Sequence, residues 1–450
     1  MRRRVVISGL GVVTGLGVGL EPFWEGFVEG RSALGPIERF DTSGFASQLG
    51  ADVRDFTAKT WVPKSYRKAV KVMARDIELA VAAAQMAADD AGLKTRAGAD
   101  DDSEMTYPAG RTGAHIGAGL IAADTTELAS AFVTASDGDS STFEWARWGT
   151  GEGGDGAMNN LPPLWLLKYL PNMLSCHVSI IHGACGPSNT HTNAEASGLL
   201  AIGESSRVIE RGQADVCYAG SAESKVNPMG WMRMTKAGRL AETPAEGDGS
   251  RYVRPFDPES PGMLLGEAGG ILILEESASA KARGARVYAE VEGFGAGQGA
   301  PPYLPPRPAP DETPADEGLS GASERALADA GADADSIDAI VPHGLGAPSA
   351  DAAEAGALRA VFGDRLGEIP LLTWTPNIGG CVAGNGGVQV ALAAKALAEG
   401  VLPARVHAGR PAEGLRAGSG ASEKRSMRRV LVCASAYGGQ SAALIVRAAD

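Results

Sequence analysis

The sequence is poor in features that mark secreted, metal-binding or membrane proteins. Its 450 residues include five cysteines, an odd number, and no C-x-x-C pair. This argues against a disulfide framework and a zinc site, so we expect reduced thiols and no metal. No apolar run approaches the ~20 residues of a membrane span. Glycines interrupt the apolar N-terminal stretch, which is therefore predicted to be a buried strand rather than a signal peptide. We expect a cytoplasmic protein with no membrane partner.

Excess positive charge and nucleotide-binding motifs are also missing. The formal net charge of −13 argues against a nucleic-acid partner, because neutralising phosphates requires a basic surface. The sequence has no P-loop and no G-x-S-x-G motif. The glycines of the opening stretch GLGVVTGLGVG do not keep the G-x-G-x-x-G register, and no acidic residue follows at the distance that ribose binding needs. No cofactor is therefore expected.

The sequence does contain an alternation of predicted strands and helices. The chain is longer than one average domain, so we expect two cores or two fused layers. Strands are predicted over residues 4–10, 112–119, 216–220 and 286–293, a strand hairpin over 262–275, and helices over 21–30, 73–91 and 321–330. This alternation predicts parallel or mixed sheets that helices cover on both faces.

The two halves of the chain repeat the same order of elements. Each half runs from a strand through a helix ending in D-A-G to a strand that stops at a glycine. The segments ADVCYAGSAES (214–224) and VLVCASAYGGQS (430–441) form a matching pair near the two ends. This ordered similarity predicts an internal duplication of one βαβ-type unit. We place the two units at residues 1–275 and 276–450.

Several segments resemble the β-ketoacyl-acyl-carrier-protein synthase family. They are VVISGLGVVTGLGVGLEPFWEGFVEGRSALGPIERFD, MARDIELAVAAAQMAADDAGL, GPSNTHTNAEASGLLAIGESSRVIERGQADVCYAGSAES, RPFDPESPGMLLGEAGGILILEE, VPHGLGAPSADAAEA and IGGCVAGNGGVQVALAAKAL. The similarity extends over nearly the whole chain. It implies an α/β thiolase fold, in which two duplicated αβαβα halves form a five-layered sandwich.

The resemblance implies a thiolate nucleophile at a helix start, where the helix N-terminus lowers the thiol pKa. The turn Gly186-Pro187-Ser188 matches the family motif that precedes the nucleophile by a fixed short run, and the downstream residues match without a gap. This register places Glu195 at the nucleophile position. Cys185 precedes the turn and is interpreted as a half-buried thiol. A carboxylate cannot form the required thioester, although an acidic residue in the first turn of a helix is also favoured for its charge alone.

Family members also carry two histidines and commonly a lysine, which assist decarboxylation and stabilise the developing enolate. His343 in PHGLGAP matches the first histidine, and Asp351 and Glu354 follow as structural positions. Cys381 stands at the second histidine position and Pro376 at the lysine position. A single retained histidine is equally well explained as a structural residue.

This pattern of losses resembles the chain-length factor, or ketosynthase-β, subunit of type II polyketide synthases. The resemblance implies a subunit that does not condense, forms a heterodimer with a catalytic ketosynthase across the edge strands, and shapes the tunnel for the growing chain. Such subunits commonly carry Gln at the nucleophile position. An ionised Glu195 cannot donate the hydrogen bonds of a Gln amide, so any decarboxylase role is not transferred.

Two enzymatic alternatives stay open. One is a self-standing synthase-like acyltransferase or malonyl-carrier decarboxylase that uses Glu195 and His343 as an acid/base pair. The other is a condensing enzyme whose thiol is Cys185 or Cys381.

Two further regions bear on the tunnel and on partners. Ala123, Thr126 and Ser130 fall at helical spacing and are candidates for the tunnel wall, with ordinary helix packing as the alternative. Residues 136–160, which include two tryptophans, are interpreted as an insertion, relative to the family, that forms a loop over the interface. The sequence also holds a basic patch, defined as Lys59, Lys64, Arg67, Lys68 and Lys71. Within it, Lys64, Arg67 and Lys68 are candidates for docking an acidic acyl carrier protein, and a solvated helix face is the alternative.

Overall fold

One long mixed sheet runs through the molecule. The structure, a computed structural model, describes residues 2–136, 142–149, 156–301, 309 and 311–449. The sheet has ten strands in the order β10-β13-β14-β9-β1-β8-β7-β5-β6, with β2 paired to β1. These strands are β1 (Val5–Thr14), β2 (Gly17–Val18), β5 (Thr112–Gly117), β6 (Ser188–His191), β7 (Val216–Ser224), β8 (Glu267–Glu276), β9 (Ala289–Gln298), β10 (Ala339–Val341), β13 (Arg429–Ser435) and β14 (Gln440–Ala448). As predicted, parallel and antiparallel pairs coexist: β5 is parallel to β6 and β7, and β10 to β13, whereas β8 is antiparallel to both its neighbours.

The sheet consists of two halves with the same strand order. The first half is β1-β8-β7-β5-β6, and the second is β9-β14-β13-β10, continued by a bridge from Ile340 to Leu371. The halves join where Val5–Ile7 pairs with Ala289–Val291. This repetition confirms the predicted internal duplication. The predicted boundary after Glu275 falls at the end of β8 and stays a prediction.

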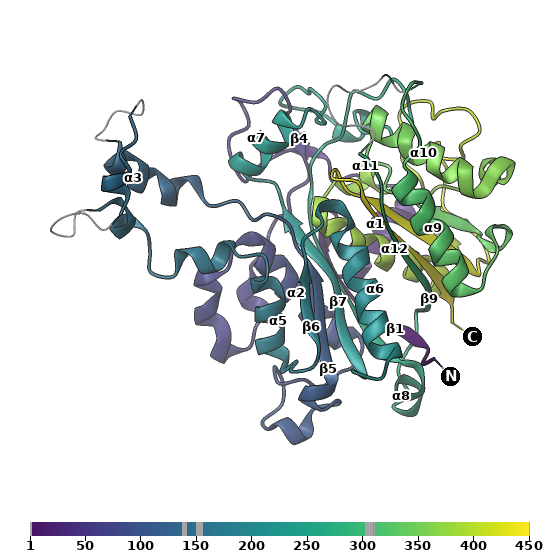
Figure 1. The fold of residues 1–450 in the computed structure, drawn as a ribbon, viewed down its shortest axis with the longest axis horizontal. Helices are drawn as coiled ribbons and strands as arrows, with labels where there is room; N and C mark the ends of the chain where they lie inside the picture. The colour runs from purple at the N-terminus through teal and green to yellow at the C-terminus, as the bar shows by residue number, and fades with distance from the viewer. Residues whose placement is uncertain (1, 137–141, 150–155, 302–308, 310, 450) are drawn as a thin grey trace.

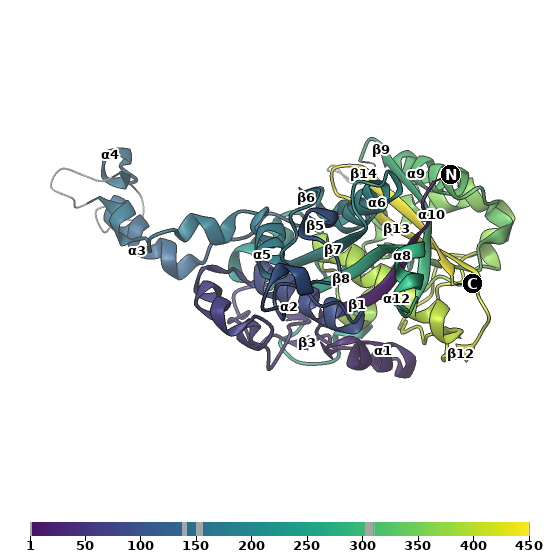
Figure 2. The ribbon, with the colours of Figure 1, turned by 90° about the horizontal axis from the view of Figure 1, so that it is seen from below.

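Helices cover the outer faces of both halves and also fill the space between them (Figures 1 and 2). On the outside, α2 (Arg75–Asp90) packs on β1, β8 and β7, and α9 (Glu317–Ala330) packs on β9, β14 and β13; α5 (Met173–His182) and α10 (Pro348–Phe362) extend these layers. On the inside lie α6 (Ser197–Glu210) and α12 (Asn385–Glu399), and α12 contacts β7, β8, β13 and β14. The order helix, sheet, helix, sheet, helix is the five-layered α/β arrangement expected of the thiolase fold.

Smaller elements complete the fold. The other helices are α1 (Leu20–Glu29), α3 (Thr125–Ala135), α4 (Trp145–Trp148), α7 (Pro228–Lys236), α8 (Ser277–Ala282) and α11 (Thr375–Ile378). Two short strand pairs are β3 (Gly35–Pro36) with β4 (Leu49–Gly50), and β11 (Val401–Leu402) with β12 (Glu423–Lys424). The helices predicted over 21–30, 73–91 and 321–330 are confirmed as α1, α2 and α9. Within the described residues, no helix is both long and apolar enough to cross a membrane.

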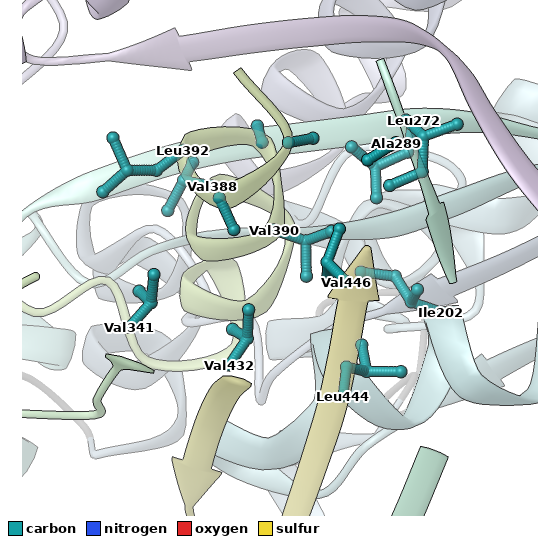
Figure 3. Close-up of a cluster of buried hydrophobic side chains, with 14 of the residues drawn as sticks. Ile202, Leu272, Ala289, Val341, Val388, Val390, Leu392, Val432, Leu444 and Val446 are labelled. Atoms are coloured by element: carbon teal, nitrogen blue, oxygen red, sulfur yellow. The ribbon is translucent and has the colours of Figure 1, made fainter. Parts of the chain in front are cut away.

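The inner helices bring the two halves together around one core. Side chains of α12 meet those of α6 and of both half-sheets in Figure 3, which labels Ile202, Leu272, Ala289, Val341, Val388, Val390, Leu392, Val432, Leu444 and Val446. The two helix starts touch at glycines, because a Cβ added to Gly386 would lie 2.8 Å from the Cα of Gly198. This contact places the loops that precede α6 and α12 side by side.

The hairpin predicted over 262–275 is wrong. Residues of this segment form the single strand β8, which is antiparallel to both β1 and β7. Its two glycines do not make a turn but admit helices on both faces of the sheet. A Cβ on Gly269 would lie 2.7 Å from the carbonyl oxygen of Leu79 in α2, and one on Gly270 would lie 2.5 Å from the carbonyl carbon of Gly387 in α12. Close packing against helices on both faces thus explains why glycines stand at these two positions.

An arm projects from the body between the end of β5 and the start of α5 (Figures 1 and 2). It carries α3 and α4 and includes the described part of the predicted insertion over 136–160; residues 137–141 and 150–155 of that insertion lie outside the described residues. The predicted helical face of Ala123, Thr126 and Ser130 is wrong in part. Ala123 precedes α3, because the side chain of Asp124 caps the helix by accepting the backbone N–H groups of Thr126 and Glu127.

Candidate functional site

Two short 3₁₀ turns face each other at the centre of the molecule. They are η8 (Ala194–Ala196), which leads into α6, and η12 (Val382–Gly384), which leads into α12. Each starts at a residue with positive φ, 46° at Ala194 and 48° at Val382. This conformation is uncommon for residues other than glycine and clusters at functional sites. The sharp turn directs residue 195 into the space between the two halves.

The two turns share a hydrogen-bonding pattern that reflects the duplication. The backbone N–H of Asn193 donates to Ser197 Oγ at 2.8 Å, and the backbone N–H of Cys381 donates to Asn385 Oδ1 at the same distance. Cys381 therefore stands in the second half where Asn193 stands in the first. By the same register Glu195 is the counterpart of Ala383, so a charged side chain enters the centre from one half only.

Glu195 is buried, with 2% of its surface exposed, and both carboxylate oxygens have a donor. Oε1 accepts a hydrogen bond from Arg239 Nη1 at 2.7 Å, and Oε2 accepts one from the backbone N–H of Tyr437 at 3.0 Å. Arg239 is also buried, and its guanidinium lies 5.1 Å from the centre of the Tyr437 ring. The carboxylate is therefore enclosed in a charge-assisted pair.

Glu195 is held as the anion. Burial alone raises the pKa of its carboxyl group, but the charge of Arg239 and the hydrogen bond from the Tyr437 amide lower the pKa below its usual value. A carboxylate has no proton to donate and cannot form a thioester by acyl transfer. An acid/base pair of Glu195 and His343, one of the alternatives left open by the sequence, would lack its acid in this state.

His343 is buried beside this pair and is neutral. Burial lowers the pKa of His343 to about 4, and Glu195 only partly opposes this. Asn385 Nδ2 lies 3.3 Å from His343 Nε2, while its Oδ1 accepts the N–H of Cys381. Since Nδ2 can only donate, Nε2 is the acceptor and Nδ1 carries the proton.

Two buried acids hold the His343 loop in place. Glu354 accepts the backbone N–H groups of His343 at 2.7 Å and Gly344 at 2.8 Å. Asp351 accepts the N–H groups of Leu345 and Gly346 in the same loop. These contacts match the structural positions expected for the two acids.

The two remaining predicted positions supply no base or cation. Cys381 is buried, and burial, aided by Glu223 and Glu267, raises the pKa of its thiol, so the group is a neutral thiol. Pro376 lies buried in α11, where its carbonyl accepts the hydroxyl of Ser32 at 2.7 Å.

Cys185 lies at the other end of β6 from Glu195. Its side chain precedes the strand and is exposed, so the half-buried thiol expected from the sequence is wrong. Its backbone N–H donates to the carbonyl of Ala109 at 2.9 Å. Because β6 separates it from the turn at Ala194–Ala196, Cys185 does not contribute a thiol to the centre described here.

Sequence reasoning missed Arg239, Tyr437 and Asn385. A buried acid signals the need for a cation, but nothing in the sequence says which arginine supplies it. Arg239 and Tyr437 also line a cavity of about 370 Å³, together with Gly238, Pro258, Ser260, Pro261, Gly262, Ala347, Pro348, Ser349 and Ala350. Glu195 and His343 are not among its lining residues, so the Arg239–Tyr437 contact stands between the cavity and the buried centre.

The tunnel candidates separate in space. Ala123 lines a cavity of about 280 Å³ at the root of the arm, with Arg39, Arg75, Lys168 and Tyr169 among its other lining residues. Thr126 and Ser130 are exposed on α3 instead. The structure thus does not unite the three residues in one wall of this chain.

The basic patch is exposed on and beside the 3₁₀ helix η2 (Lys64–Val72). Within the described part of the chain, its five cations form no ion pairs. Tyr66 of the same helix anchors it to α5 through a 2.8 Å hydrogen bond to His177 Nδ1. The helix that carries the patch is therefore held against α5, and the charges of the patch face solvent without an acidic partner among the described residues.

Comparisons with known proteins agree with this architecture. Residues 2–280 match the model of the β-ketoacyl synthase N-terminal domain, and residues 288–409 that of its C-terminal domain. The chain is 31% identical to a 3-oxoacyl-[acyl-carrier-protein] synthase 2 of Synechocystis, over 91% of this chain and 89% of the relative. It is 28% identical to the synthase 2 of Vibrio cholerae, over 99% of both chains. It is similar to the ishigamide ketosynthase/chain length factor structure over the full length of both chains, with a TM-score of 0.81 and 27% identity.

Proposed function

We propose that this chain, which belongs to the β-ketoacyl synthase family, is a non-condensing subunit of the chain-length factor type. It pairs with a catalytic ketosynthase in type II polyketide or fatty-acid-like biosynthesis and shapes the tunnel of the growing acyl chain. The observation that carries the proposal is Glu195: where the family chemistry needs a thiolate, this chain has a carboxylate already bound to Arg239 and the Tyr437 amide.

The neighbouring groups do not replace the missing chemistry. Condensation needs a thiol that accepts the acyl group and donors that stabilise an enolate oxygen. His343 has its Nε2 facing the Asn385 donor, and Cys381 is a neutral buried thiol. The relatives include proteins named 3-oxoacyl-[acyl-carrier-protein] synthase 2, so overall similarity does not distinguish a condensing enzyme from a non-condensing subunit. The proposal therefore rests on the residues at positions 195 and 381. The condensing thiol must come from a partner.

The free edge of the sheet supports the proposed pairing. Within the described residues, β6 has a strand on one side only. Beside it lies a groove of about 580 Å³ without a charged residue, lined by Asn172, Ser175, Cys176, Ser179, Ile180, Ala184, Gly186, Ser188, Asn189 and Thr190. Ile180 is 54% exposed there. An open edge flanked by an uncharged groove suits the addition of a strand from another chain.

The arm supports the same interpretation. Large apolar side chains are exposed along it, namely Phe132, Val133, Phe143, Trp145, Met158, Leu164 and Leu166. Trp145 is the most exposed of these side chains, at 78%. A soluble monomer rarely exposes so many apolar groups together, so we infer that a partner ketosynthase covers the arm. The basic patch remains available for an acidic acyl carrier protein.

The tunnel role is assigned most directly to Ala123, which lines the cavity at the root of the arm. Thr126 and Ser130 are exposed on α3 and would border the tunnel only where a partner covers the arm. In the paired complex, we expect Ala123→Phe to shorten the product by filling this cavity. Product length unchanged by that substitution, in an otherwise active pair, would remove Ala123 from the tunnel wall.

Co-expression with a partner ketosynthase tests the proposal. We expect a stable one-to-one complex that condenses, while the chain alone does not. Ile180→Asp should prevent pairing because it places a charge in the groove beside β6. Ala282→Asp, an exposed substitution on α8 far from the arm (Figure 1), is the control and should leave pairing intact.

Other outcomes would replace the proposal. A chain that purifies as a homodimer and condenses by itself would refute it. Release of CO₂ from malonyl-carrier by the isolated chain, abolished by Glu195→Ala, would instead establish the decarboxylase alternative.

A further inference from the structure

We propose that Arg239 and the backbone amide of Tyr437 form a carboxylate-binding site, and that Glu195 is a tethered ligand that fills it. When the Glu195 side chain is removed, this site takes a small external monocarboxylate such as acetate. The inference concerns the isolated chain and does not depend on the proposed pairing with a ketosynthase.

The two donors come from elements far apart in the chain. Arg239 follows α7, and Tyr437 lies in the turn between β13 and β14. One donates a charged N–H to Oε1 and the other a neutral N–H to Oε2. Two convergent donors, one of them cationic, are a common arrangement for binding a carboxylate. Glu195 satisfies it with the last atoms of its side chain.

Other contacts hold the donors in place independently of Glu195. The carbonyl of Arg239 accepts the N–H of Met263 at 2.9 Å, and a bridge joins Leu240 to Met263. The Tyr437 turn is closed by a 2.7 Å hydrogen bond from the Ala436 N–H to Gln440. The Arg239 guanidinium also lies over the Tyr437 ring. Loss of the Glu195 side chain therefore leaves a preorganised site, which lowers the cost of binding a replacement.

The electrostatic environment favours an anion at this place. Arg239 is a buried cation, and the N-terminus of the 14-residue helix α6 begins directly after η8. Helix N-termini stabilise negative charge. His343, the imidazole that faces the pair, is neutral because burial lowers its pKa to about 4. Removal of Glu195 takes away the carboxylate that the guanidinium binds at 2.7 Å, which is costly in a buried place.

An external carboxylate has a route to this site. The cavity of about 370 Å³ is bounded by Arg239 and Tyr437, and its other walls are formed by loops around Ser260 and Ala347. Replacing Glu195 by Ala removes a CH₂–COO⁻ fragment, which is nearly the size of acetate. A ligand of this class can therefore reach the guanidinium from the cavity, and it is nearly as large as the fragment that the substitution removes.

The test is the thermal unfolding of Glu195→Ala in acetate and in chloride at equal ionic strength and neutral pH. Acetate should raise the Tm of this variant in a saturable way, by about 1–2 °C at a tenfold excess over its Kd. The native chain should not respond, because its site is filled. Glu195→Gln should not respond either, since the amide occupies the same volume.

Arg239→Met combined with Glu195→Ala is the decisive control. This double variant keeps the vacated space and loses the cation, so its response to acetate should disappear. Equal Tm values for Glu195→Ala in acetate and chloride would overturn the proposal, as would an equal response in the double variant. If Glu195→Ala is recovered only by refolding, acetate-dependent yield supports the proposal and equal yields in both salts contradict it.

Discussion

Replacing Arg239 by methionine isolates the energetic role of the buried pair. Methionine keeps much of the apolar stem and removes the guanidinium that binds Glu195 at 2.7 Å. Breaking a buried pair by removing one partner costs about 3–5 kcal/mol, because an uncompensated charge stays behind. For a chain of 450 residues, the average unfolding entropy converts this loss into a Tm lower by about 3–5 °C.

The pH dependence of this loss identifies its cause. In the native chain the pKa of Glu195 is lowered, so its stabilising contribution is present above the unfolded pKa and is lost as the pH falls through the folded value. In Arg239→Met, burial without the cation raises the folded pKa above the unfolded one. The variant then regains stability as the pH falls, by about 1.4 kcal/mol for each unit of the raised pKa. The difference between the two chains should therefore shrink at mildly acidic pH.

Denaturant unfolding of four chains measures these terms. They are the native chain, Arg239→Met, Glu195→Gln and the chain that carries both of these substitutions. Each is measured at neutral and at mildly acidic pH. The double variant should lose less than the sum of the single variants, because neither partner is left alone. A loss below about 1 kcal/mol in Arg239→Met, or a loss equal at both pH values, would refute the ion pair as a buried, charged interaction.

Three further predictions follow from the site and the core. In Glu195→Cys, the neighbouring guanidinium and the α6 N-terminus should lower the pKa of the new thiol below about 8.5. The pH dependence of alkylation at this cysteine, followed on the peptide that contains it, measures that pKa. A profile typical of a free thiol would contradict the prediction. His343 should stay neutral from neutral pH down to about 5, so a change in the ¹⁵N shifts of its ring above that pH would be inconsistent with its burial. Gly386→Ala should destabilise the chain by about 1–3 kcal/mol, since the added Cβ would lie 2.6 Å from the Leu199 nitrogen. Gly98→Ala, where the added Cβ would meet open space, is the control and should leave the stability unchanged. Equal stability of the two variants would argue against the close contact of α6 and α12.

The buried pair with Arg239 explains how a carboxylate can be accommodated at residue 195. A carboxylate without a partner at this depth would take up a proton or destabilise the fold. Arg239 removes that cost and keeps the carboxylate ionised. Arg239 is therefore the cation that makes a carboxylate stable at this position.

Sequence patterns predicted the elements whose side chains repeat at a fixed spacing. The helix over 73–91 is confirmed because its apolar residues face a core in every turn. The strand over 216–220 is confirmed and is buried at every position, with successive side chains facing two different cores. The hairpin predicted over 262–275 is wrong, and two glycines lie within the strand β8 that replaces it. A glycine pair looks the same in sequence whether it bends the chain or admits the backbone of another helix, and here Gly270 admits α12. Only the packing distinguishes the two.

The sequence by itself determined the family, the duplicated fold and the position of Glu195 at a helix start. Each depends on residues near each other in the chain, where spacing carries the information. Tertiary structure decided what Glu195 does. Its donors Arg239 and Tyr437 lie 44 and 242 residues away in the chain, on elements that only the closure of the two half-sheets around α6 and α12 brings together. The state of a buried charge is set by the groups that surround it in space, and local sequence does not specify them.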